Sequence, residues 1–173
     1  IRLGLASGKP IKEHESVHEL EPTNQVKSIK TMLLDKSLIR DDFVFYFDRI
    51  ASILLSKALD NLPISGKNVI ETPSNAVVED SMVCNFEQIT AVNLIRSGDC
   101  FMHSLKNTIP NISMGKLLIQ SDSQTGEPQL HCEFLPTDIE KYETVLLMEA
   151  QIISGAAMIM AIQVLLDHGV LLE

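Results

Sequence analysis

Two short segments of the chain carry residue types that could bind an anionic group. Arg96, Ser97 and Gly98 place a cationic side chain, a hydroxyl and a glycine in one turn after an apolar run. Ser154 and Gly155 precede a long apolar segment, so the serine could cap a helix and the glycine would let backbone amides approach a ligand. Because helix N-termini attract negative charge, the helix start at the second segment is a possible anion site.

The second segment holds few of the groups that a phosphate site normally uses. Ala156 and Ala157 follow the glycine, and the bulky Ile152 and Ile153 precede the serine. Each lost hydrogen bond to a charged group removes about 1.5–3 kcal/mol of binding free energy. Two such losses would weaken phosphate binding by a factor on the order of 100 or more.

Both segments lie between an expected strand and an expected helix. Residues 89–95 and 145–148 are short apolar runs typical of buried strands, and the residues after each turn continue at helical spacing. Open α/β sheets place their ligand sites at such turns, at the carboxyl ends of the strands. Residues 116–120 and 129–134 predict two further strands, joined as a hairpin by a loop rich in turn-forming residues.

The first half of the chain predicts two helices and an extended segment. One helix is expected to begin at Thr23 or Asn24, and a second is expected to be capped by Asp41 or Asp42. The expected core-facing stripe of the second helix consists of Phe43, Phe47, Ile50, Leu54 and Ala58. Residues 66–80 are expected to form an extended segment and a loop.

The composition argues against several classes of function. The chain has 173 residues, enough for one domain with a sizeable core, and a formal net charge of -9. A nucleic-acid or anionic-membrane surface needs a basic patch, so we expect neither partner. No apolar run reaches the roughly 20 residues of a membrane span. Three separated cysteines favour reduced thiols in the cytoplasm, with the nucleus left open.

Residues 1–22 are rich in glycine, proline and charged side chains, so we expect a linker or the end of a preceding domain there. Within them, His14, Glu15 and His18 fit the His-Glu-x-x-His pattern of zinc peptidases. That pattern also needs a buried helix and a third ligand, and the sequence shows neither. We therefore expect no metal site.

Four segments of the chain resemble, in the same order, the eukaryotic uracil phosphoribosyltransferases. They are residues 42–50, residues 93–99, residues 115–120 and the loop at Ser154. The sequence is similar in particular to the C-terminal domain of fungal uridine kinases, which follows a P-loop kinase domain. The resemblance implies an α/β fold: a phosphoribosyltransferase-type parallel sheet flanked by helices, with a small β hood. It implies transfer of phosphoribose from 5-phosphoribosyl-1-pyrophosphate to uracil.

The resemblance also implies roles for individual residues. The implied phosphate and pyrophosphate contacts, in vestigial form, are Arg96, Ser97, Gly98, Ser154 and Gly155. Arg96 matches the arginine of the family's Arg-Ala-Gly motif, although a turn arginine paired with a carboxylate remains an alternative. Glu149 stands where the family has the aspartate that contacts the ribose hydroxyls.

Several positions depart from the family pattern. Ala150 replaces a proline, Ala156 a glycine and Ala157 a serine in the donor loop, and Ser121 replaces an arginine. The last change removes a positive charge from a site that must bind a strongly anionic donor. The family's uracil-recognising Pro-Gly-x-Gly-Asp-Phe-Gly-Asp segment does not occur, so residues 23–173 are expected to form a domain that is incomplete at its C-terminus.

We therefore predict a degenerate uracil phosphoribosyltransferase-like domain that serves assembly or regulation of a uridine kinase in pyrimidine salvage. The alternatives are an active uracil phosphoribosyltransferase that makes UMP and an interaction module unrelated to nucleotides. We assign no catalytic residue and expect no cofactor in this chain. ATP and magnesium would serve the parent kinase, because the sequence has no Gly-x-x-x-x-Gly-Lys-Ser/Thr loop. A homo-oligomer and a nucleotide or phosphoribosyl ligand are the expected partners.

Overall fold

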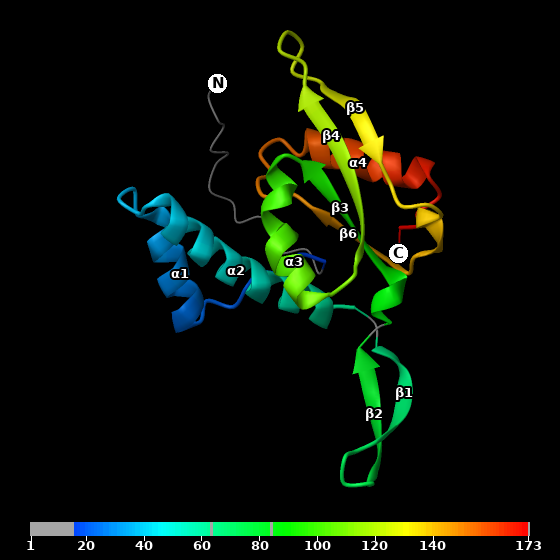
Figure 1. Cartoon of the computed structure of the whole chain (residues 1–173). Coiled ribbons are helices and arrows are strands. Elements are labelled where there is room, and N and C mark those ends of the chain that lie inside the picture. Colours follow the sequence, from blue (N-terminus) through cyan, green and yellow to red (C-terminus); the bar gives the residue numbers. More distant parts are fainter. Residues whose placement is uncertain (1–15, 63, 84, 173) are drawn as a thin grey trace.

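The computed structural model, which describes residues 16–62, 64–83 and 85–172, is organised around a four-stranded sheet (Figure 1). In spatial order the strands are β5 (Pro128–Phe134), β4 (Ser113–Ser121), β3 (Ile89–Ile95) and β6 (Thr144–Met148). β3 is parallel to β4 and to β6, whereas β5 pairs with β4 in the antiparallel direction. The parallel sheet that we expected is therefore a mixed one, because the predicted hairpin adds an antiparallel edge strand.

One face of the sheet packs against helix α4 (Ala156–Asp167). Val92 and Leu94 of β3 point to this side and form a buried cluster with Ala161 and Leu165 of the helix. α4 carries apolar side chains at nearly every position, as its long apolar run predicted. None of the described helices is both long enough and apolar enough to cross a bilayer.

The opposite face packs against α2 (Arg40–Asp60) and α3 (Met102–Thr108) (Figure 1). Ile89 of β3 lies in a buried cluster with Leu55 of α2 and Leu105 of α3. A short 3₁₀ helix, η2 (Ser97–Phe101), connects β3 to α3. Because β3 is covered on both faces, its side chains are almost all buried, which explains its near-continuous apolar sequence.

Helix α1 (Asn24–Leu34) packs against α2 and begins as predicted. The Val26 backbone N–H donates to Thr23 Oγ1 at 3.3 Å, which confirms Thr23 as the N-cap. Val26 and Ile29 are buried at its inner face.

Helix α2 differs from the sequence prediction at its start and in its buried face. Ile39, without a side-chain hydrogen bond, occupies the N-cap, and Asp41 and Asp42 lie in the first turn, where they favour the helix dipole. The predicted stripe is only partly correct. Its members Phe43 and Leu54 are exposed, whereas the fully buried positions of α2 are Ala51 and Leu55.

An antiparallel hairpin of β1 (Ile64–Glu71) and β2 (Val77–Val83) projects from the rest of the structure (Figure 1). It forms a sheet of its own, and its position fits the small β hood that we expected. The predicted extended segment with β-branched residues is thereby confirmed. The expected linker or preceding domain at residues 1–22 lies mostly outside the described residues, as do His14 and Glu15.

Candidate functional site

Three chain segments meet at the carboxyl edge of the sheet. β3, β4 and β6 are parallel, so the turn after Ile95, the end of β4 at Ser121 and the loop after Met148 lie at the same edge. Two of these segments are the ones that the sequence singled out. The topology therefore brings the two predicted phosphate-binding segments to neighbouring strands, β3 and β6.

The turn after β3 is attached to the loop after β6 by one carboxylate. Ser97 Oγ donates a hydrogen bond to Glu149 Oε1, and the Gln151 backbone N–H donates to the same oxygen at 3.2 Å. Gly98 is buried and lies so close to β6 that a Cβ at this position would overlap the carbonyl oxygen of Met148. The glycine is thus required by close packing of the turn on the neighbouring strand.

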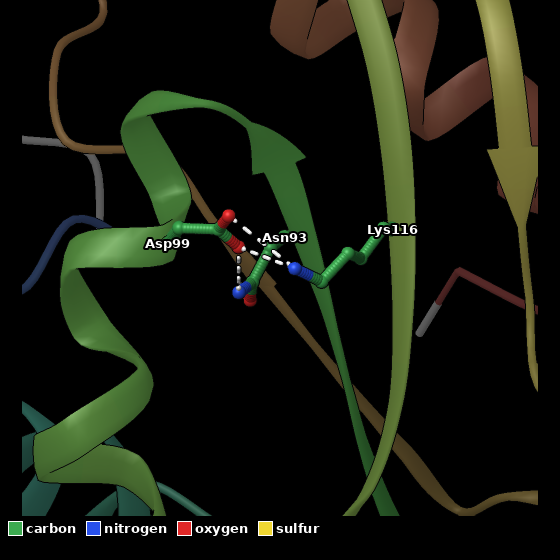
Figure 2. Close-up of polar contacts among 3 residues, drawn as sticks. All are labelled: Asn93, Asp99 and Lys116. Carbon is green, nitrogen blue, oxygen red and sulfur yellow. Dashed lines mark hydrogen bonds and ion pairs between the residues drawn. The ribbon is translucent and has the colours of Figure 1, made fainter.

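A polar cluster beneath this turn was not predicted from the sequence (Figure 2). Asn93 of β3, which is fully buried, donates from Nδ2 to Asp99 Oδ1 at 3.1 Å. Lys116 of β4 donates from Nζ to the two oxygens of Asp99 at 3.1 and 3.3 Å. The sequence signal was the single amide side chain in the mostly apolar strand β3.

This cluster keeps Asp99 ionised and holds the ammonium group of Lys116. The hydrogen bond from Asn93 lowers the pKa of the Asp99 carboxyl, with a further contribution from Lys116, although partial burial acts in the opposite direction. The pair of Lys116 and Asp99 is more than one-third exposed, so its contribution to stability is small. Asn93 Oδ1 is buried and has no hydrogen-bond partner among the described residues.

The loop after β6 leads into α4 one residue later than predicted. Gly155, in a left-handed conformation with φ of 80°, is the N-cap, and α4 begins at Ala156. Ser154 lies just before the cap, and its Oγ accepts a hydrogen bond from the Ala156 N–H at 3.3 Å. The prediction of Ser154 as N-cap is therefore wrong by one residue, because the positive φ is a conformation that glycine adopts readily.

A hollow of about 330 Å³ lies between this loop, the start of α4 and the end of β4. Its described lining residues are Ser121, Glu149, Gln151, Ile152, Ile153, Ser154, Gly155, Ala157 and Met158. The only charged residue among them is Glu149, and its charge is negative. The start of α4 offers only the partial positive charge of a helix N-terminus.

The predicted contact residues divide into two groups in the structure. Glu149, Ser154 and Gly155 line the hollow. Ser97 reaches it only through its hydrogen bond to Glu149. Arg96 is exposed, is not among the lining residues, and forms no ion pair within the part of the chain that the structure describes. No group of three or more potential metal ligands is present among the described residues.

This arrangement defines an α/β fold of the phosphoribosyltransferase type, with ligand loops at the carboxyl edge of a mainly parallel sheet. The fold is similar to a solved structure of a protein from Aquifex aeolicus, with a TM-score of 0.72 and 19% sequence identity; the match covers 88% of this chain and 71% of the other. The uracil phosphoribosyltransferase family profile matches residues 20–173. The chain therefore belongs to the uracil phosphoribosyltransferase family.

Similar proteins include both kinases and phosphoribosyltransferases. A uridine kinase of Saccharomyces cerevisiae is 65% identical over 173 residues, which are all of this chain and 34% of the kinase. Uridine-cytidine kinase-like 1 of Mus musculus is 36% identical, over 98% of this chain and 31% of that protein. A uracil phosphoribosyltransferase of S. cerevisiae is 36% identical, over 95% of this chain and 73% of its own length. The chain thus spans about a third of the kinases that it matches.

Proposed function

We propose that this chain is the uracil phosphoribosyltransferase-like domain of a uridine kinase in pyrimidine salvage, and that it serves assembly or regulation instead of its own phosphoribosyl transfer. The support from sequence is the 65% identity to a uridine kinase along the whole chain. ATP and magnesium would be bound by a kinase domain, because this chain contains no P-loop sequence.

The charge of the hollow is the observation that carries the proposal. A phosphoribosyl pyrophosphate donor bears several negative charges, and sites for such groups use arginine, lysine or closely spaced backbone amides. Here the described lining contains no cationic side chain. Ser121 and Ala157 lie at two positions where the family resemblance implies an arginine and a serine. The hollow therefore disfavours the donor that phosphoribosyl transfer requires.

Calorimetry and a product assay test this proposal together. We expect no saturable heat when 5-phosphoribosyl-1-pyrophosphate and magnesium are titrated into the chain, and no UMP when uracil is added. The S. cerevisiae uracil phosphoribosyltransferase, assayed in parallel, is the positive control for both measurements. Donor binding below about 1 mM together with turnover would overturn the proposal.

An active uracil phosphoribosyltransferase is the second candidate function, and the turn after β3 favours it. Gly98 still packs tightly against β6, and Ser97 still reaches the carboxylate of Glu149, so this part of the site keeps an ordered geometry. This candidate predicts that Arg96→Ala and Glu149→Ala each abolish uracil-dependent growth of a strain that relies on the protein. Our proposal predicts that such a strain fails to grow on uracil with or without either substitution, because the chain would not supply the activity.

Self-association is part of the proposed role in assembly. Large apolar side chains are exposed on and next to α2, namely Ile39, Phe43, Val44, Phe45 and Leu54. Contiguous exposed apolar surface is typical of protein interfaces. We expect a homo-oligomer in light scattering after gel filtration. A strictly monomeric protein at micromolar concentration would contradict this expectation.

We also expect a cytoplasmic location in cells. A purely organellar signal would contradict that expectation.

A further inference from the structure

We propose that two copies of this chain associate through α2, with the two helices antiparallel across a two-fold axis at Phe45. The inference rests on the proposed function, in which the chain serves assembly, and it names the contact through which a second copy binds. The choice of partner follows from three side chains on the surface of α2. Together they are self-complementary in charge and have an aromatic ring at their centre.

Asp41, Phe45 and Arg49 form one stripe on the surface of α2. They are spaced four residues apart, so neighbours in the stripe are separated by about 6 Å along the helix axis and by only about 40° around it. All three are exposed, and Phe45 has 56% of its surface accessible. The fully buried positions of α2, Ala51 and Leu55, lie on another side of the helix. The start of α2 also projects with α1 away from the sheet (Figure 1), which leaves the stripe accessible to a partner.

The two charges of this stripe are not paired within the part of the chain that the structure describes. Neither Asp41 nor Arg49 forms an ion pair there. The Arg49 guanidinium lies 5.7 Å from the centre of the Phe45 ring, and Tyr46 packs against the same ring in a T-shaped arrangement at 5.3 Å between centroids. Both contacts restrict the orientation of Phe45. The stripe therefore presents a positioned aromatic ring between two opposite charges.

A two-fold axis at Phe45 brings opposite charges together. In an antiparallel pair of helices, the residue four positions before Phe45 lies opposite the residue four positions after it in the second copy. Asp41 of each copy then faces Arg49 of the partner subunit, and the two Phe45 rings pack together between these ion pairs. A parallel pair would place like charges opposite each other, which is unfavourable. The stripe therefore favours an isologous, antiparallel contact.

The overall charge of the chain makes such a contact more selective. The formal net charge is -9, so two copies repel each other over much of their surface. A second copy is best accommodated where each carboxylate meets a cation. Ile39, which is 63% exposed at the N-cap of α2, adds apolar contact area beyond Asp41 at each end of the pair.

Sedimentation equilibrium of the 173-residue chain and its charge variants tests the inference. Arg49→Asp and Asp41→Arg each place two like-charge pairs in the contact, so each should weaken self-association at least about tenfold. The double variant with both substitutions restores opposite charges and should associate as the unsubstituted chain does. Glu127→Arg, in the exposed loop between β4 and β5, makes the same change in net charge as Asp41→Arg and should not weaken association. Circular dichroism checks that every variant is folded.

A mixture of the two single variants tests the two-fold geometry. Asp41→Arg leaves two arginines in the stripe, and Arg49→Asp leaves two aspartates. A mixed dimer therefore contains both ion pairs, although neither variant can form them with itself. We expect the mixture to associate about as tightly as the unsubstituted chain.

The outcomes separate this inference from the function on which it rests. Single variants that associate like the unsubstituted chain overturn the inference, and so does a folded double variant or a mixture that stays monomeric. In these cases the unsubstituted chain still self-associates, so the expected homo-oligomer stands and another surface forms it. A monomeric unsubstituted chain overturns both the inference and the expected homo-oligomer. The proposed absence of phosphoribosyl transfer is decided separately, by the calorimetry and the product assay.

Discussion

The packing of Gly98 against β6 gives a quantitative test of the site geometry. In Gly98→Ala the new Cβ would overlap the carbonyl oxygen of Met148 and lie 3.2 Å from its carbonyl carbon. These atoms belong to a strand backbone, so they cannot move aside as the end of a flexible side chain would. Overpacking of this kind costs about 1–3 kcal/mol. Displacement of the turn would also break the hydrogen bond from Ser97 to Glu149, which contributes about 1 kcal/mol at a partly exposed site.

The expected loss of stability is therefore about 2–4 kcal/mol, which corresponds to a decrease in Tm of roughly 5–15 °C for a chain of this size. Urea unfolding followed by circular dichroism measures the free energy directly. Gly126→Ala is the matched control, because Gly126 has a φ of 73° and open space around it. That substitution costs only the left-handed strain of about 1–2 kcal/mol. A loss for Gly98→Ala no larger than the control would refute the described contact with β6.

Three further predictions concern ionisable groups near the same turn. Asn93→Asp should place a buried carboxylate against the carboxylate of Asp99. Urea unfolding at pH 7 should then show a loss of stability of about 2 kcal/mol. The loss should be smaller near pH 4.5, where one of the two carboxylates can be protonated. The pKa of Asp99 is lowered in the folded chain. Its contribution to the free energy of unfolding is therefore present above the ordinary aspartate pKa and is lost as the pH falls through the lowered value. Asp99→Asn should therefore reduce stability at pH 7 by about 1 kcal/mol and flatten the acid side of the stability profile, whereas an unchanged profile would contradict the cluster. Burial, followed by the negative charges of Glu149 and other nearby carboxylates, raises the pKa of the Cys100 thiol. Peptide mapping should therefore show that iodoacetamide alkylates Cys100 more slowly at pH 8 than it alkylates a free thiol. An equal rate would argue against this environment.

Much of the fold followed from periodicity, because strands and helices here differ clearly in length and pattern. The apolar runs at residues 89–95 and 145–148 form β3 and β6, and the turn-rich loop after residue 121 joins β4 and β5 as the predicted hairpin. The buried face of α2 could not be predicted from periodicity. Its first turns carry apolar residues around most of the helix, Phe43, Val44, Phe45 and Phe47 among them. Such a pattern does not define a single apolar face. The packing of α2 against β3 decides which of its residues are buried.

The position of the site and its eroded donor loop were predictable, but its polar cluster was not. Glycines and hydroxyls at strand ends indicated the two loops, because parallel strands bring their carboxyl ends to one edge. The cluster of Asn93, Asp99 and Lys116 depends on the register that pairs residue 93 with residue 116, and periodicity does not give strand register. The missing positive charge was predicted from Ser121, whereas the grouping of Ser121, Glu149 and Ala157 around one hollow emerges only when β4, β6 and α4 are placed together.

The proposed loss of donor binding is tested most directly by a crystal structure of the chain soaked with ribose 5-phosphate. The account predicts no ordered phosphate over Ser154 and Gly155, because the described lining offers no cationic side chain. A ribose 5-phosphate molecule at full occupancy, with its phosphate on the backbone amides at the start of α4 and its hydroxyls on Glu149, would contradict it.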